Sequence, residues 1–239
     1  MDMKKPSLGP TTRLEMGAAI LAAAQTHSTR HIDRRLTAFV AAQRRFAVAQ
    51  RRVDAADERL RAALARVAAR DRAQDAALEG LARALVAEGQ PRRNPFAAFG
   101  SAAPSELKDI AAAEEAKAIH ELVGAVRGHK LVGKTTLEAA QVVEKAARAV
   151  EAALVLLAAL EQQSRASRQR RDTIGHEWDG AMAALRRGAR AAADDGAPEL
   201  YTALFGRFVR PAPKKRKPEP ATSPPVTAPA VQPGASPTS

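Results

Sequence analysis

The feature that most constrains this chain is a stretch from Ala18 to Glu79 with neither glycine nor proline. These two residues are the strongest interrupters of an α-helix, so their absence over such a length predicts one or two very long helices. The stretch also lacks the clusters of turn-forming residues that separate short elements. The chain is therefore expected to build an elongated helical object.

Local signals set the ends of this predicted helix. Thr12 and Glu15 have the spacing of a capping box, and Gly89 followed by Pro91 is a typical helix stop. We accordingly predict a flexible lead over residues 1–10 and one long helix over residues 11–88. The alternative is a local break near residues 26–29, where serine and threonine can cap a second start.

Composition favours thin helical packing over a globular core. The chain is 46% hydrophobic but only 3% aromatic, and 57 of its 239 residues are alanine. Alanine is the best helix former, and alanine-rich helices with a narrow stripe of larger residues pack closely in pairs. In this respect the composition resembles that of alanine-rich bacterial coiled-coil proteins, among them the phasins that coat polymer granules.

Heptad repeats indicate how the long helix packs. One core position recurs every seven residues, and its companion four residues later includes Gln43, Gln50, Asp57 and Leu64. Such sustained spacing is typical of a coiled coil, in which polar members fix register or oligomeric state. A second seam follows after residue 135. The predicted seam comprises Ile32, Phe39, Phe46, Val53, Leu60, Val67, Leu81, Val143, Val150, Leu154 and Leu157.

The remainder of the chain completes an all-α prediction. Residues 89–103 read as a loop, residues 104–195 as helices that return along the first, and residues 198–209 as a short amphipathic helix. Residues 210–239 are rich in proline and basic residues, so we predict a disordered tail. The architecture is either a long antiparallel coiled-coil hairpin or an elongated three-helix bundle.

The basic balance of the chain predicts anionic partners. The formal net charge is +12 and the isoelectric point is about 10.8. Four arginines recur every seven residues, and a basic run lies in the tail, so a nucleic acid, an anionic membrane or a granule surface is a candidate partner. The alternatives are a solvated face, or pairing with Glu138, Glu144, Glu151 and Glu161. The predicted anionic-surface residues are Arg45, Arg52, Arg59, Arg66, Lys214, Lys215, Arg216 and Lys217.

One segment matches a phosphate-binding loop. Gly128, Gly133, Lys134 and Thr135 fit the pattern in which backbone amides cradle phosphates and lysine meets the terminal phosphate. The pattern requires a buried β-strand before it, whereas the preceding residues read as helix. The alternative is a glycine-rich connector with a threonine cap, so nucleotide binding is a remote hypothesis.

Three aromatic residues are concentrated near the end of the helical region. Tyr201, Phe205 and Phe208 lie on one predicted amphipathic helix. Such a helix docks either into a groove of a partner or onto its own bundle. Both interpretations stay open on the sequence.

The sequence offers little chemistry. It contains no cysteine, which excludes thiolate catalysis and fits a cytoplasmic location. We find no nucleophile–base–acid set, and predict no enzyme activity, metal, cofactor or small-molecule substrate. The main hypothesis is a non-enzymatic scaffold or adaptor that assembles with itself or another helical protein. The second hypothesis is binding to an anionic surface.

Overall fold

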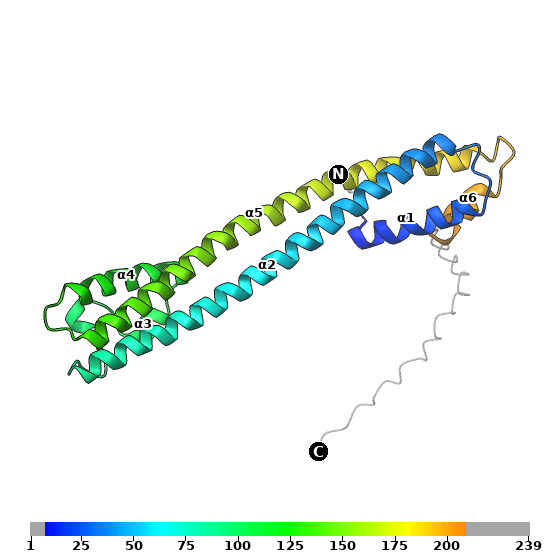
Figure 1. The fold of residues 1–239 in the computed structure, drawn as a ribbon. Helices are drawn as coiled ribbons and strands as arrows, with labels where there is room; N and C mark the ends of the chain where they lie inside the picture. Colours follow the sequence, from blue (N-terminus) through cyan, green and yellow to red (C-terminus); the bar gives the residue numbers. More distant parts are fainter. Residues whose placement is uncertain (1–7, 209–239) are drawn as a thin grey trace, which may run out of the picture.

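The computed structural model describes residues 8–208, and every regular element in that range is a helix. Two long helices dominate, α2 (Asp33–Ala87) and α5 (Lys134–Ala191), and they pack against each other along the rod (Figure 1). They run antiparallel, since Phe39 near the start of α2 contacts Trp178 near the end of α5. At about 1.5 Å per residue each helix is roughly 80–90 Å long. The all-α prediction and the pairing of long helices are confirmed.

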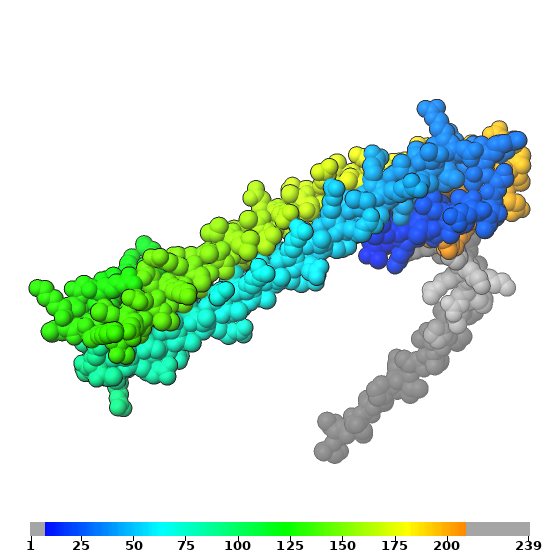
Figure 2. Space-filling model, viewed as in Figure 1, coloured from blue at the N-terminus to red at the C-terminus, as the bar shows by residue number. Residues whose placement is uncertain are grey.

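The predicted helix over residues 11–88 is not continuous. The chain instead forms α1 (Pro10–Gln25), turns, and starts α2 at Asp33, so α1 lies against α2 over one end of the rod only (Figure 2). Hydroxyls at the turn compete with helical hydrogen bonding: the Thr26 Oγ1 donates to the Ala23 carbonyl at 3.0 Å. Folding back also removes Ile20 from water completely. The alternative break near residues 26–29 is the one observed.

Neither the predicted capping box at Thr12 nor the predicted cap at Thr135 forms. Helix α1 begins after Gly9 with Pro10 in its first turn, which places Thr12 inside the helix and shortens the predicted lead. Helix α5 likewise begins after Gly133, one residue before Thr135, and has no N-cap side chain. In both cases an extended glycine makes the entry into the helix.

Short elements connect and close the rod. The predicted loop over residues 89–103 contains one 3₁₀ turn (Ala97–Phe99), and it begins at Gly89, whose φ of +95° suits glycine. The predicted helix after it divides into α3 (Pro104–Lys108) and α4 (Ala112–Gly128). The predicted amphipathic helix is α6 (Leu200–Phe205) with a 3₁₀ turn (Gly206–Phe208). The predicted tail lies outside the described residues.

Two separate hydrophobic cores lie at opposite ends of the rod. At the near end, α1 and α6 pack on the first part of α2 and the last part of α5, around Trp178, Phe39 and Phe46. At the far end, α3 and α4 pack on the last part of α2 and the first part of α5, around Leu78, Leu81 and Ile119. Between them lies a waist, residues 54–72 of α2 and 148–168 of α5, which belongs to neither core. Among residues 8–208, a third helix therefore contributes to a hydrophobic core toward the two ends of the rod and not in the waist.

The seam between α2 and α5 differs from the predicted seam in one respect. The residues of the predicted seam are buried near the ends of the rod, as at Phe39, Phe46 and Leu81. In the waist they are half-buried, at Leu60, Val67, Leu154 and Leu157. A further row, three residues after each core position, is buried and consists of Ala42, Ala49, Ala56 and Ala63. The predicted companion, four residues after each core position, is buried only toward the ends, at Gln43, Leu78 and Leu85. Small alanines let the two backbones approach closely, so the helices pack there without large side chains.

Candidate functional site

The four predicted arginines lie on α2, and all four are exposed. Arg45 reaches Glu177 of α5, with 3.2 Å between Nη2 and Oε2. Within residues 8–208, Arg52, Arg59 and Arg66 have no carboxylate within 4.0 Å. None of the four arginines pairs with a glutamate predicted for them, because Glu138, Glu144, Glu151 and Glu161 meet other cations, and Arg45 pairs with a different glutamate of the returning helix.

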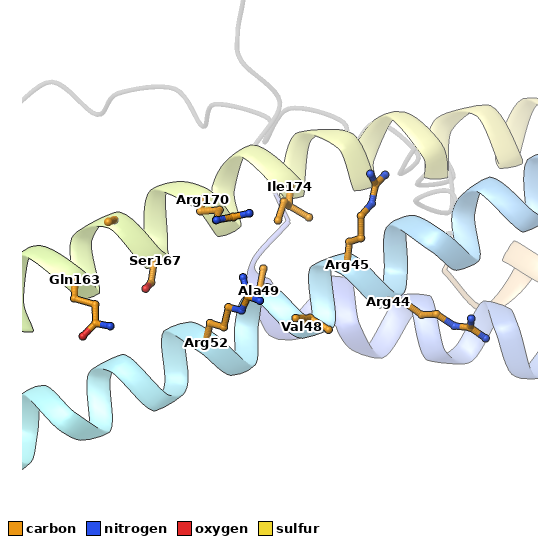
Figure 3. Close-up of a pocket in the computed structure, with 10 residues that line it drawn as sticks. Arg44, Arg45, Val48, Ala49, Arg52, Gln163, Ser167, Arg170 and Ile174 are labelled. Atoms are coloured by element: carbon orange, nitrogen blue, oxygen red, sulfur yellow. The ribbon is translucent and has the colours of Figure 1, made fainter.

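Two of these arginines border a groove between α2 and α5. The groove has a volume of about 510 Å³, and Arg45 and Arg52 extend from α2 toward α5 along it (Figure 3). Its floor is apolar and includes Ala49, Ala166 and Ile174. The rim arginines are Arg44, Arg45, Arg52 and Arg170. We name this feature the arginine-rimmed groove.

Helical periodicity explains why the groove stays open. The third helices of the two ends contact residues that share one heptad position: Asp179 binds Arg13 of α1, and Glu144 and Glu151 bind α4. The groove residues Arg45 and Arg52 occupy a different heptad position of α2 from Gln43, which contacts α1 through the Leu14 carbonyl. The groove therefore lies on a side of the hairpin that α1 does not cover.

The charge of the described chain is concentrated at the near end. Residues 8–56 and 164–208 contain 16 basic residues, all arginine, against 9 acidic residues. Residues 57–163 contain 15 basic and 15 acidic residues. The groove thus sits in a positive field that the rest of the rod does not share.

A polar interruption of the seam lies next to the groove. The Ser164 hydroxyl donates to the Asp57 carboxylate at 2.7 Å, and Arg168 donates to the same oxygen at 2.9 Å. The hydrogen bond from Ser164, followed by that from Arg168, lowers the pKa of Asp57. A polar cluster at a core position favours one register over shifted ones.

The waist carries apolar side chains on its surface. Leu64 is 50% exposed and Val155 is 72% exposed. Leu64 shares a heptad position with Gln43, which meets α1, and with Leu78, which packs in the far core with α4. Leu64 therefore lies where a third helix covers the hairpin at each end, and no third helix of the described chain covers it.

The phosphate-loop geometry is not formed. Helix α4 precedes Gly128 where a β-strand is required, and no strand occurs in residues 8–208. The Gly133 amide donates to the Glu88 carboxylate at 3.1 Å, and the Thr136 hydroxyl donates to it at 2.7 Å. A carboxylate of the chain itself therefore occupies the anion position at this helix start, while Lys134 and Thr135 point into solvent.

The three aromatic residues predicted to dock a partner serve their own bundle. Phe205 is fully buried in the near core, and Tyr201 and Phe208 pack against that core. Arg190 stacks over the Tyr201 ring at 4.8 Å and donates to its hydroxyl at 3.0 Å. The alternative, docking onto the chain's own helices, is the one observed.

Sequence reasoning missed two polar sites. At the near end, Arg13 forms a two-pronged pair with Asp179, at 3.0 and 2.7 Å, and Trp178 donates to the buried Gln43. At the far end, burial, followed by the charges of Asp75 and Asp71, raises the pKa of Glu115 to about 7. Gln74 of α2 is buried beside Glu115 of α4. Its burial against α4 was not predictable, because no periodicity places α4.

Other kinds of site are not found in the described chain. Residues 8–208 contain no cluster of three histidine, aspartate or glutamate side chains arranged to hold a metal ion. No described helix has a segment long and apolar enough to cross a membrane. Comparison with known protein families, with curated proteins and with solved structures finds no match for this chain.

Proposed function

We propose that this protein is a non-enzymatic scaffold: an elongated coiled-coil rod that assembles with itself or with another helical protein. The observation that carries this proposal is the waist. In the waist only α2 and α5, among the described helices, run side by side. Leu64 is exposed there at the heptad position that a third helix covers at each end, and Val155 is exposed on α5. Exposed apolar residues on a helical seam are typical of an interface between helices.

Sedimentation velocity over a range of protein concentrations tests self-assembly. We expect the wild-type chain to form dimers or larger oligomers, and the double variant Leu64→Gln/Val155→Gln to shift toward monomer. Leu131→Gln is the matched control, because Leu131 is 86% exposed in the far-end loop between α4 and α5. A waist variant that associates as strongly as wild type would exclude the waist as the self-assembly surface.

The second candidate function is binding to an anionic surface. It is favoured by the arginine row, in which Arg52, Arg59 and Arg66 have no carboxylate partner among residues 8–208. Binding of this kind weakens steeply with salt, because counterions are released from the polyanion. Replacing Arg45, Arg52, Arg59 and Arg66 by glutamate should abolish retention on heparin and on anionic vesicles. The tail residues Lys214–Lys217 belong to the same proposal but lie outside the described structure.

A further inference from the structure

We propose that the arginine-rimmed groove is a docking site for an acidic amphipathic helix of a partner protein. This inference rests on the proposed scaffold function and names the chemistry of the partner. The groove supplies an apolar floor for one face of such a helix and guanidinium groups for the acidic flanks of that face.

The shape of the groove suits a helix. It runs along the seam of two antiparallel helices over residues 44–52 of α2 and 163–174 of α5. Ala49 and Ala166 have small side chains, so the backbone of a docked helix can come close to this part of the floor. Val48 and Ile174 provide larger apolar contacts. Val48 is 40% exposed, which leaves apolar area that a docked helix would remove from water.

The rim selects acidic side chains. Arg44, Arg52 and Arg170 have no carboxylate within 4.0 Å in the described chain, and the pair between Arg45 and Glu177 is mostly exposed. Guanidinium groups bind carboxylates through two parallel hydrogen bonds, which gives direction as well as charge attraction. Glutamates on both flanks of an apolar stripe would meet the two sides of the rim.

The charge distribution argues against a second copy of the chain in this groove. The near end has 16 arginines against 9 acidic residues, so two near ends repel each other. The acidic start of α4 is packed into the chain's own far core, where Glu115 is buried. The groove lining also contains no aromatic residue to stack on bases, and its apolar floor offers nothing to phosphates.

A designed peptide tests the proposal on the full chain. The probe is a fluorescently labelled helical peptide with leucine at positions i, i+3, i+4 and i+7 and glutamate on both flanks, measured by fluorescence anisotropy. Ala166→Trp fills the groove, and Arg45→Glu/Arg52→Glu reverses its rim. We expect each to weaken binding by about tenfold or more, because hot-spot contacts and desolvated charge pairs dominate such interfaces.

The chain offers matched controls. Ala159→Trp lies one heptad earlier on α5, at a residue that is also exposed, and Arg59→Glu/Arg66→Glu continues the same arginine row outside the groove. Both should bind within about twofold of wild type. Circular dichroism verifies that each variant is folded.

Three outcomes would overturn the proposal. One is no binding of the acidic peptide. Another is equal loss of binding in the groove variants and their controls, which would mean general attraction to a basic surface. The last is a lysine-flanked peptide that binds as well as the glutamate-flanked one. The sedimentation experiment stays separate: if the waist variants alter self-assembly while the peptide does not bind, the docking site fails and the scaffold function survives.

Discussion

The near and far ends of the rod each place a third helix against the same pair, α2 and α5, but they stabilise it differently. The near core is built on aromatic rings, with Phe39 and Phe46 at 5.6 and 6.4 Å from Trp178 between ring centroids. The far core is built mainly on leucine, valine and isoleucine, with Phe96 as its one fully buried aromatic residue. A chain with 3% aromatic residues therefore concentrates large rings at one end.

The two ends also differ in how their buried polar groups are hydrogen-bonded. At the near end Gln43 accepts from Trp178 and donates to Leu14, and the Arg13 guanidinium meets Asp179. At the far end the side-chain amide of Gln74 and one oxygen of Glu115 are buried without a hydrogen-bond partner, whereas the one such atom at the near end, the Arg186 Nε, belongs to a guanidinium that stacks over the Phe205 ring at 5.3 Å. Because unpaired buried polar groups cost free energy, the near end has directional contacts that fix α1, whereas the far end carries a destabilising site. Pairing of buried groups, and not only apolar area, distinguishes the ends.

The largest expected effect is selective loss of the near core. Trp178→Ala removes the ring that contacts Phe39 and Phe46, and we expect it to lower the free energy of unfolding by about 3–5 kcal/mol. Hydrogen exchange should then rise in α1 and α6 and stay unchanged in α4. Leu85→Ala, in the far core, should produce the opposite pattern. Equal exchange changes at both ends in either variant would show that the rod has one cooperative core.

The pH dependence of stability should come from the far end. The folded-state pKa of Glu115 is about 7, raised from its ordinary 4.5, so the folded state binds the proton more tightly than the unfolded state. Stability from this group is therefore full below pH 4.5 and lost as pH rises through 7, a loss of about 3 kcal/mol. Glu115→Gln should unfold with less pH dependence between pH 5 and 8, and be more stable than wild type at pH 8.

Urea titrations at pH 5 and pH 8 measure this difference. The histidines are present in both proteins and cancel in the comparison, and the lowered pKa values of Asp57 and Glu144 leave those carboxylates ionised throughout. Lys108, which opposes the rise in the Glu115 pKa, also stays charged in this range. A Glu115→Gln variant with the wild-type pH profile would contradict the assignment.

The smallest expected effect is at the start of α5. Glu88→Ala removes the acceptor of the Gly133 amide and the Thr136 hydroxyl, and we expect a loss of about 1 kcal/mol. Hydrogen exchange should increase in the first turn of α5 alone. Glu138→Ala is the control, since Glu138 approaches only the exposed Lys134 side chain at 3.8 Å. If both variants exchange alike, the Glu88 contact does not cap the helix.

The sequence predicted the residues on one side of the candidate groove, those of α2, but not the residues on the other side. Periodicity alone placed Arg45 and Arg52 together on one row of α2, because residues seven apart share a helix face. Arg170 and Ile174 come from α5, more than 100 residues later, and join them only through the register between the helices. The same row continues to Arg59 and Arg66 with no change of pattern, so the sequence did not show where the groove ends.

For α6 the sequence predicted an apolar face but not the surface that this face packs against. Phe205 was recognisable as part of an apolar face, but an apolar face does not say what covers it. The turn after α1 sends that helix back along α2, and α1 and α6 then contact each other. The aromatic face that the sequence offered for docking a partner therefore packs against the chain's own helices.

The sequence by itself determined the helices, since helix formation depends on local propensity and on the absence of glycine and proline between Ala18 and Glu79. It also determined the stripe on α2 that faces another helix, because burial follows the heptad period. The tertiary structure alone decided where α1 lies after the turn that follows Gln25, that alanines form a buried row between α2 and α5, and that the waist stays uncovered. These features depend on contacts between residues far apart in the chain, where several arrangements satisfy the same local pattern and only mutual packing selects one.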